Sequence, residues 1–496
     1  MSSRSRGAFV FIFIAVLVDS IGFGIILPVL PRLIIELTGV GMDRAAVYGG
    51  WLSFVYALMQ FFCAPVLGNL SDRFGRRPVL LAALLALGCD YLIMGFAPAI
   101  GWLFAGRLIA GVAGASFTPA YAYVADVTPP ERRAQSFGLV GAAFGIGFIV
   151  GPAIGGLLGG LGPRAPFFTA GAIALANTTL GYFALPESLP QRLRRPFHWT
   201  RANPLGTVLQ MLKYPVVSRL LGALFLWQIA HQVLPSTWAF YTISKFHWTS
   251  AEVGYSLAFV GLLMALAQGA LTRVLIPWLG GARRAAAAGM AAAIIAYVGY
   301  AFATEGWMMY VVALTTFVFA LTYPSMNALA SQPIPPDAQG ELQGAVAGLY
   351  SLSSIVGPPL MTQVFGHFSA RSAGLYFPGA AFLTAALLTA GCAALFARAL
   401  RGLAPQDNGR RAAAKPDSLN PRGNAAPREP ADSTSRRSRT SPYGVSAPAQ
   451  VSGQCRDGPP TPSTMDGYVL CTGDVVILRR RGEVPAYLIS PIGVDL

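Results

Sequence analysis

The sequence Ile-Val-Gly-Pro-Ala-Ile-Gly-Gly at residues 149–156 returns in diverged form as Ile-Val-Gly-Pro-Pro-Leu-Met-Thr at residues 355–362, which is 206 positions later. The arginine pair at residues 76–77 returns at residues 283–284, which is 207 positions later. Two separate landmarks with nearly the same offset indicate that the chain contains a duplicated unit. Each copy fits within about half of the first 400 residues.

The segments around these landmarks are strongly apolar. Of the 496 residues, 54% are hydrophobic and 11% are charged, whereas a soluble protein carries about 25% charged residues. Runs long enough to cross a bilayer lie near residues 8–30, 46–67, 78–97, 99–123, 136–159, 165–185, 217–241, 253–278, 284–303, 306–330, 341–366 and 373–397. We therefore predict an all-α polytopic membrane protein with twelve transmembrane helices in two pseudo-symmetric six-helix bundles.

The longest loop between these runs divides the chain into parts. We predict an N-terminal bundle at residues 1–185, a cytoplasmic linker at 186–216, a C-terminal bundle at 217–400 and a tail at 401–496. The tail between residues 404 and 466 is rich in Pro, Ser, Arg and Gly without an apolar period, so it is predicted to be largely disordered. Residues 467–490 look like strands but are too short to fold alone.

Basic residues are distributed unequally between the two sides of the predicted helices. With the N-terminus placed in the cytoplasm, 18 Lys and Arg residues of the helical region fall on that side and five fall on the other. This asymmetry follows the positive-inside rule and predicts a protein of the cell inner membrane with both termini in the cytoplasm. It also explains the net charge of +15 without a nucleic-acid partner. The lipid bilayer is the expected environment, and a monomer is the expected functional unit.

Several classes of enzyme and binding site are disfavoured by missing motifs. The dipeptide Gly-Lys does not occur, so the chain has no Walker A loop for ATP. There is no His-Glu-x-x-His sequence, and the five cysteines include no Cys-x-x-Cys pair, which argues against a zinc site or a disulfide framework. We expect no metal, no cofactor and no enzymatic activity.

Three ionisable residues lie inside the predicted helices: Asp19 in the first, Asp90 in the third and Arg107 in the fourth. A charge at the bilayer centre costs about 2.5–3.5 kcal/mol, so the three residues predict a shared polar cavity. Burial favours the protonated carboxyl, whereas a nearby arginine favours the ionised one. This combination suits a group that takes up and releases a proton; a structural ion pair is the alternative. The equivalent positions of the second half are uncharged, which places proton handling in the first half.

Four neutral or weakly basic side chains complete the candidate cavity: Gln60, Gln228, His231 and Gln268. Gln228 and His231 belong to the seventh helix, together with Trp227 and Trp238, which we expect to offer an aromatic surface. A lone histidine in a membrane helix more often packs and hydrogen-bonds than relays protons, so a proton role for His231 is the less favoured interpretation.

Two motifs carry a family resemblance. The turn between the second and third helices reads Gly68-Asn-Leu-Ser-Asp72-Arg73-Phe-Gly75-Arg76-Arg77-Pro78, and the fifth helix carries Gly147, Gly151, Pro152, Gly155 and Gly156. They resemble the loop signature and the antiporter signature of the major facilitator superfamily. The stretches at 17–31 (LVDSIGFGIILPVLP), 56–65 (YALMQFFCAP) and 89–98 (CDYLIMGFAP) resemble its tetracycline/proton antiporter branch. The resemblance covers about residues 8–398.

The resemblance implies a role for each motif. In the family, the arginine matched by Arg76 pairs with an acid at the end of the fourth helix, which Asp126 matches. Such a pair would hold one face closed and break when that face opens; charges that only set topology are the alternative. The Gly-Pro run of the fifth helix is associated with exporters that exchange substrate for protons, although small residues also simply permit close helix packing.

We therefore expect a secondary active transporter that exports small amphipathic drugs in exchange for protons by alternating access. A facilitator or importer with the same fold is the alternative, and a sensor or scaffold that transports nothing is a third possibility. The sequence departs from the tetracycline pattern at Ala293, where the family has an acid, and at Met264, where it has a histidine; Gln268 is retained. Weak or absent tetracycline resistance is therefore expected.

Overall fold

The computed structural model describes residues 3–197, 213–335, 338–370, 374–401, 467–472 and 475–480. The chain divides into two compact units, Met1–Asn408 and Gly409–Leu496. Residues 198–212 of the predicted linker and most of the predicted disordered tail lie outside the described residues. The second unit contributes strands β1 (Gly467–Thr472) and β2 (Val475–Arg480), which pair in antiparallel fashion. The strand-like pattern at 467–490 is thus confirmed for these twelve residues.

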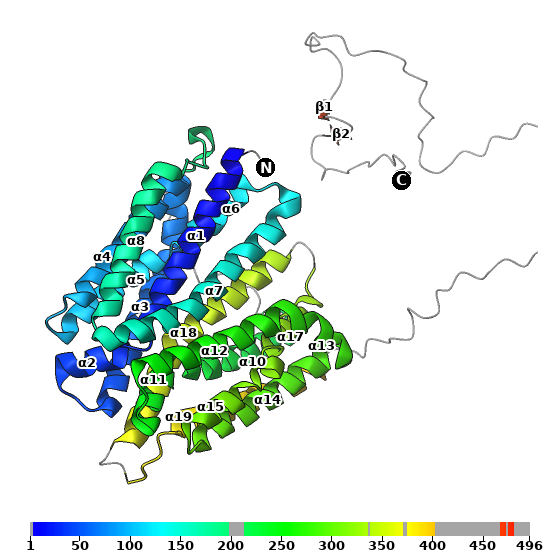
Figure 1. Cartoon of the computed structure of the whole chain (residues 1–496). Helices are drawn as coiled ribbons and strands as arrows, with labels where there is room; N and C mark the ends of the chain where they lie inside the picture. The colour runs from blue at the N-terminus through cyan, green and yellow to red at the C-terminus, as the bar shows by residue number, and fades with distance from the viewer. Residues whose placement is uncertain are drawn as a thin grey trace, which may run out of the picture. The chain divides into compact units, whose positions relative to one another are not determined.

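The first half of the helical unit contains eight α-helices and three short 3-10 helices among its described residues. They are α1 (Ser3–Ile26), α2 (Leu30–Thr38), α3 (Met42–Phe74), α4 (Arg76–Gly95), α5 (Ile100–Gly114), α6 (Phe117–Val127), η1 (Pro130–Arg132), α7 (Arg133–Leu158), η2 (Gly159–Leu161), α8 (Ala165–Ala184) and η3 (Gln191–Leu193). Figure 1 draws these helices in blue to green-cyan.

The second half begins at α10. The eighth span of the chain, which lies in this half, contains a π-helical turn, η5. Its elements are α10 (Pro215–His231), α11 (Val233–Phe246), α12 (Ser250–Leu266), η5 (Ala267–Leu271), α13 (Thr272–Trp278), α14 (Ala282–Phe302), α15 (Gly306–Ala313), α16 (Thr316–Phe319), α17 (Thr322–Ser331), α18 (Gln339–Ser369) and α19 (Ala380–Leu400). Thr249 and Glu252 form the capping box at the start of α12, in which each side chain accepts the other residue's backbone N–H.

Among the described residues, twelve spans are long and apolar enough to cross a membrane, which confirms the predicted number and the all-α fold class. The second span is longer than predicted, because α3 continues through residues 68–74 of the loop motif and ends at Phe74. Gly68 is therefore helical and does not make a turn; its missing Cβ lets α3 approach Thr118 of α6. Gly75 makes the turn, with φ at +107°, a value that glycine adopts readily.

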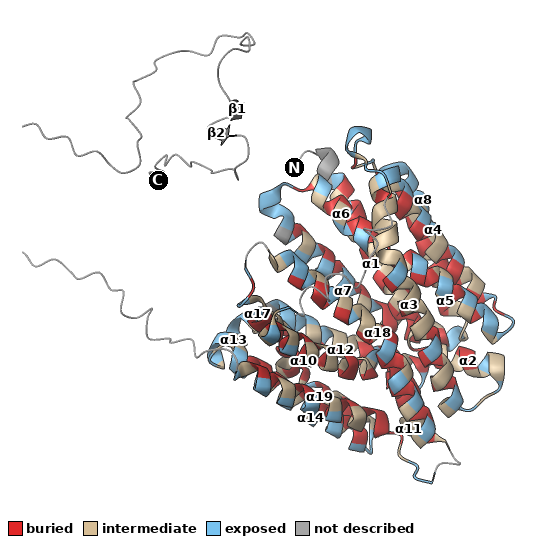
Figure 2. Cartoon of the chain, turned by 180° about the vertical axis from the view of Figure 1, so that it is seen from behind, coloured by how far each residue is buried: buried red, intermediate tan, exposed pale blue. Residues whose placement is uncertain are grey.

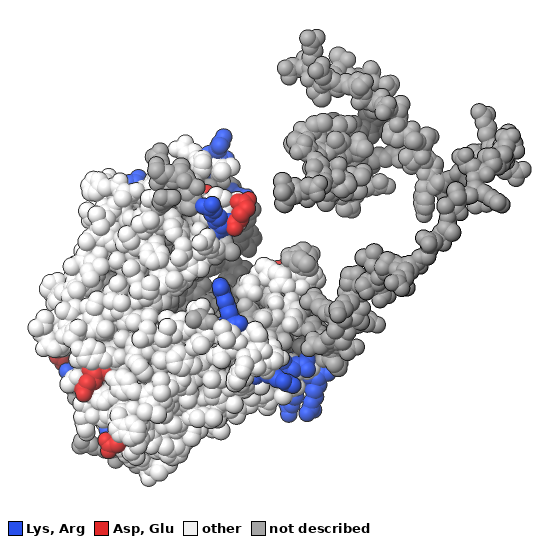
Figure 3. Space-filling model, turned by 45° about the vertical axis from the view of Figure 1, so that its right-hand side comes forward, with Lys and Arg blue, Asp and Glu red and all other residues white. Residues whose placement is uncertain are grey.

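Charged side chains are unevenly distributed on the exterior of this unit. On the face shown in Figure 3 they gather toward the ends of the helices, with an uncharged band between them. Buried residues lie mainly where helices face one another (Figure 2). Large apolar side chains such as Leu180, Phe183 and Leu387 are exposed. The apolar exterior fits a bilayer, where lipid replaces water as the surrounding solvent.

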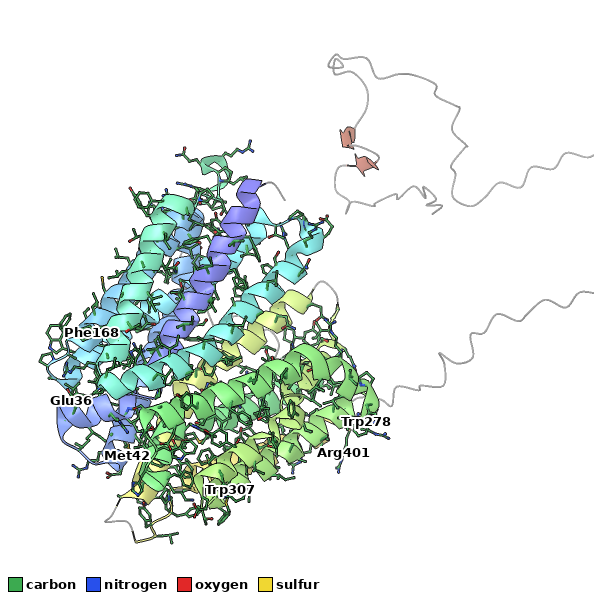
Figure 4. The ribbon with its side chains drawn as sticks, viewed as in Figure 1. Glu36, Met42, Phe168, Trp278, Trp307 and Arg401 are labelled. Atoms are coloured by element: carbon green, nitrogen blue, oxygen red, sulfur yellow. The ribbon has the colours of Figure 1, made fainter. Side chains whose placement is uncertain are left out.

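The two halves touch closely at the end opposite the start of α1 and the end of α19. Glu36, Met42 and Trp307 mark this far end in Figure 4, whereas Trp278 and Arg401 mark the terminal end. At the far end, a Cβ added to Gly156 of α7 would lie 2.6 Å from the Ser250 carbonyl oxygen of α12. A Cβ at Gly366 of α18 would lie 2.8 Å from the Asp43 carbonyl oxygen of α3. The backbones of opposite halves therefore meet there.

The terminal end is open between the halves. Gly138, Gly141 and Gly145 lie on the terminal part of α7, and no other described helix comes within 4 Å of the position that a Cβ on any of them would take. Figure 3 shows the molecule hollowed between the two groups of helices at this end. The conformation is thus closed at the far end and accessible from the terminal end.

Candidate functional site

An ion pair inside the first half joins two of the three predicted membrane charges. Arg107 Nη2 of α5 lies 2.9 Å from Asp90 Oδ2 of α4, and the Asp90 side chain has 0% exposure. Gly106 makes room for the carboxylate, because a Cβ there would lie 2.5 Å from Asp90 Oδ1. The structure therefore pairs Asp90 with Arg107, and the charge of each offsets the cost of burying the other.

The pair is surrounded by soft and aromatic groups. The Arg107 guanidinium also lies 3.2 Å from Met94 Sδ and 5.7 Å from the centre of the Tyr56 ring in α3. Gln60, one turn after Tyr56, donates from Nε2 to the Gly114 carbonyl oxygen at 3.1 Å and thereby ties α3 to the end of α5. Among the described residues, Asp90 Oδ1 and Arg107 Nε lack hydrogen-bond partners.

Asp19 stands apart from this pair. No ion pair joins it to Arg107 within the described part of the chain, and its buried Oδ1 has no hydrogen-bond partner there. The carboxyl lines a small pocket between α1, α4 and α6, together with Leu84, Ser116 and Phe117. Tyr56 and Tyr91 nevertheless lie within electrostatic range of Asp19, Asp90 and Arg107 alike. A polar cavity shared by all three charges therefore stays a prediction.

The second half places neutral and aromatic groups where the first half has charges. His231 contacts the rings of Trp227 and Phe319, whose centroids lie 6.4 Å and 5.3 Å away, and its buried Nδ1 has no partner among the described residues. Gln228 is buried one turn earlier. Nothing charged in the described residues pairs with His231, so its surroundings favour the packing interpretation.

Trp227 and Trp238 do not form the expected open surface. They are only 4% and 2% exposed, and Trp238 Nε1 donates to Ser256 Oγ at 3.0 Å. Trp227 of α10 packs against Phe319 of α16, and Trp238 of α11 packs against Tyr300 of α14. Gln268 is exposed within the π-helical turn η5, where its Nε2 lies 3.9 Å from Met264 Sδ. Ala293 is fully buried in the packed core of α14.

The loop motif forms a charged network within the first half. Arg76 Nη1 lies 2.5 Å from Asp72 Oδ1, and Arg76 Nε lies 3.3 Å from Asp126 Oδ2 at the end of α6. Arg76 therefore meets the acid that the family resemblance predicted. All members belong to one half, so the network is intact although the halves are apart at this end. The expectation that opening would break the Arg76–Asp126 pair does not hold in this conformation.

Glu187, which the sequence analysis did not single out, completes the network. Its Oε1 accepts the backbone N–H of Arg76 at 2.9 Å, at the start of α4, and the N–H groups of Ser188 and Leu189 at 3.0 Å. A Cβ at Gly75 would collide with this carboxylate. Glu187 is the lone acid among the basic residues of the 186–216 loop, and this contrast in charge is the signal that could have identified it.

The remaining arginines of the motif hold the same corner. Arg77 Nη2 donates to the Tyr182 carbonyl oxygen of α8 at 2.5 Å, and the Arg73 guanidinium lies 5.1 Å from the ring centre of Phe74. Arg195, after η3, donates its backbone N–H to the Asp72 carbonyl oxygen at 3.0 Å. The first residues of the linker are thus fastened to the α3–α4 turn.

The small residues of α7 use two different faces. Gly147, Gly151 and Gly155 pack against α1, where a Cβ on Gly151 would lie 2.6 Å from the Ile21 carbonyl oxygen. Gly156 and the Pro152 carbonyl oxygen face Ser250 and Gly254 of α12 in the opposite half, whereas the Pro152 ring lies against Gly24 of α1. One face therefore fixes α7 to the helix that carries Asp19, and the other forms part of the closed contact between halves.

Comparison with known proteins agrees with this architecture. The family model described as Major Facilitator Superfamily matches residues 12–358 and 281–443. The chain belongs to the major facilitator superfamily. It is therefore a secondary transporter with the two-bundle fold of that superfamily.

Among similar proteins, "Tetracycline resistance protein, class C" of Escherichia coli is 41% identical over 75% of this chain and 93% of its own length. "Tetracycline resistance protein, class G" of Vibrio anguillarum is 40% identical over 70% of this chain and 87% of its own length. The crystal structure of the human organic anion transporter MFSD10 is 24% identical and superimposes with a TM-score of 0.59, covering 79% of this chain and 99% of that one. This last likeness concerns the fold alone.

Proposed function

We propose that this transporter exports amphipathic drugs from the cytoplasm in exchange for protons, and that residues 1–185 and 217–400 move against each other around a central site. In this proposal the protein lies in the inner membrane with both termini in the cytoplasm. The terminal-end opening then faces the cytoplasm, from which substrate enters. The names of the class C and class G relatives support drug export.

The observation that carries the proton coupling is the contrast between the two buried carboxyls. Asp90 is held by Arg107 at 2.9 Å, which favours its ionised form. Asp19 has no such partner among the described residues, although its Oδ1 is buried. In the apolar interior, a carboxyl without a neighbouring cation is less costly to bury in its protonated, neutral form than as an anion. We assign Asp19 the exchangeable proton and the Asp90–Arg107 pair a positioning role.

The contacts of α7 link Asp19 to the proposed movement of the two halves against each other. Asp19 lies on α1, and α1 is fixed to the Gly147–Gly155 face of α7. The adjacent face of α7 meets α12 at the closed far end. A change of charge at Asp19 thus acts on the pair of helices whose contact with the second half must open during transport. We assign the loop motif, from Gly68 to Arg77, and Asp126 the role of controlling the conformation of the α3–α4 turn.

The test uses purified protein in liposomes with an imposed pH gradient and a pH-sensitive dye. In liposomes that contain the unmodified protein, addition of an amphipathic cationic drug is expected to cause a flux of protons across the membrane. Asp19→Asn is expected to reduce this flux to background. Glu305→Gln, which changes an exposed acid before α15, is the matched control and should leave the flux unchanged. Normal proton exchange with Asn at position 19 would refute the assignment.

A further inference from the structure

Five aromatic rings follow one another across the interior of the first half. Phe117 of α6 contacts Phe144 of α7 with ring centroids 5.9 Å apart, and Phe144 stacks on Phe148 at 6.4 Å. Phe148 stacks on Phe23 of α1 at 6.3 Å, and Phe23 contacts Tyr56 of α3 at 6.1 Å. We call these five residues the aromatic wall. Its rings converge from four helices, so it lies inside the bundle.

The aromatic wall borders open space, unlike the ring cluster buried in the core of the second half. Phe144 is 42% exposed, and the other four rings are partly exposed. Gly141 and Gly145, which flank Phe144 on α7, have nothing near their Cβ positions. By contrast, Tyr241 and Phe382 in the second half pack against each other and are fully buried. The wall therefore has a free surface that packing of the chain itself does not use.

Each end of the aromatic wall meets an ionisable site. Phe117 lines the same small pocket as Asp19. At the other end, the Arg107 guanidinium lies 5.7 Å from the centre of the Tyr56 ring and binds Asp90. The wall thus runs from the pocket that Asp19 lines to the Asp90–Arg107 ion pair.

We propose that the aromatic wall is the substrate-binding surface and that it selects flat aromatic compounds carrying one positive charge. This inference rests on the proposed function and names its substrate class. Flat rings gain the most from offset or edge contacts with Phe and Tyr, and ring faces attract cations. Asp19 and Asp90 exceed the single cation Arg107 by one negative charge, so the site has one charge that either a proton or a cationic substrate can balance.

The test measures binding without any gradient, in protein reconstituted into lipid nanodiscs. Ethidium serves as the flat aromatic cation, and its binding is followed by fluorescence anisotropy. Phe148→Ala is expected to weaken ethidium binding about tenfold, the loss expected for roughly one aromatic contact. Phe148→Leu, which keeps most of the apolar volume but no ring, should weaken it about fivefold on the same grounds.

Two controls make the result specific. Phe183→Ala removes a ring that is 81% exposed on α8, away from the wall, and should leave binding unchanged. Tetrabutylammonium has the same charge and no ring, so it should compete poorly with ethidium. Equal thermal unfolding of the variants, measured before binding, ensures that only folded protein is compared.

The outcomes separate this inference from the proposed function. Absence of ethidium binding by the unmodified protein, full affinity in Phe148→Ala and Phe148→Leu, or effective competition by tetrabutylammonium would overturn the inference. If the ring variants weaken binding while Asp19→Asn leaves proton exchange intact, the aromatic wall stands and the proton assignment falls. If proton exchange requires Asp19 but binding ignores the rings, the reverse holds.

Discussion

The two halves of the helical unit share a backbone plan but differ in their charges. Asp90 of the first half corresponds, 207 positions later, to Tyr297, which is 1% exposed and sits 6.4 Å from the Phe319 ring. Arg107 corresponds to Leu314. Burial of a charge in a membrane costs free energy, and the second copy of the fold does not need buried charges to fold. One copy keeps the ionisable groups, and the other fills the same positions with neutral side chains.

The turns that carry the repeated arginines show the same division. Gly75 and Gly281, which are 206 positions apart, both adopt a positive φ, at +107° and +105°. Each precedes the first residue of a long helix, α4 or α14. Arg76 is bound by Asp72 and Asp126, whereas the equivalent Arg283 is exposed and has no ion-pair partner among the described residues. The geometry is repeated, but the network is not.

The largest expected effect comes from breaking the buried pair of the first half. Arg107→Ala leaves Asp90 buried without its cation, and removal of one partner of such a pair costs about 3–5 kcal/mol. We expect a clear fall in the unfolding temperature, followed by tryptophan fluorescence, and loss of transport. Tyr297→Phe, at the position equivalent to Asp90, is the matched control and should change the unfolding temperature little.

A double change sharpens this test. Asp90→Leu combined with Arg107→Met replaces the pair by apolar side chains, and such replacements are often neutral or stabilising. We expect stability to return while transport stays absent. An Arg107→Ala protein as stable as the unmodified one would mean that the first half does not depend on this pair, and the contrast between the halves would lose its physical meaning.

The sequence was sufficient for the number of spans and for the repeat, and the family resemblance implied the Arg76–Asp126 pair. Because buried charges in apolar helices must find partners, the sequence also predicted that Asp19, Asp90 and Arg107 lie together. It could not tell which carboxyl Arg107 binds, since that choice depends on how the helices pack. Trp227 and Trp238 were misjudged for a related reason. Polar and aromatic composition marks a helix as special, but only packing decides which side of it is open.

The second prediction compares the two arginine turns. Arg76→Ala removes contacts to α3 and α6, and partly exposed pairs of this kind contribute roughly 0.2–1 kcal/mol each. We therefore expect slower exchange between the open and closed conformations rather than loss of transport. Arg283→Ala, in the unpaired turn, should have no effect. The measurement is the labelling rate of single cysteines introduced at each end of the hollow; equal rates in both variants would contradict a gate role for Arg76.

Variants of Glu187 test the same α3–α4 turn independently of Arg76. Glu187→Ala removes the acceptor for the Arg76 backbone N–H at the start of α4, and loss of a helix cap typically costs about 1 kcal/mol. Glu187→Gln keeps an acceptor oxygen and should retain most of the labelling pattern of the unmodified protein. If Glu187→Ala matches Arg76→Ala, the linker and the motif act as one structure.

The smallest expected effect concerns the neutrality of the second half. Ala293 is fully buried, and the family resemblance places an acid there and a histidine at Met264. Ala293→Asp alone would cost roughly 3 kcal/mol without a partner and is expected to lower the amount of inserted protein. The combination with Met264→His supplies a side chain that can hydrogen-bond or pair with the new acid. We expect this double variant to recover insertion and to gain a modest degree of tetracycline resistance over the unmodified protein, which should have little.

Ala286→Asp, two turns earlier and also fully buried, is the control and should gain none. The growth-inhibiting tetracycline concentration, compared at equal amounts of membrane protein, decides the matter. Strong resistance from the unmodified protein would show that a neutral second half is no obstacle to this drug, and that the charges of the first half are enough.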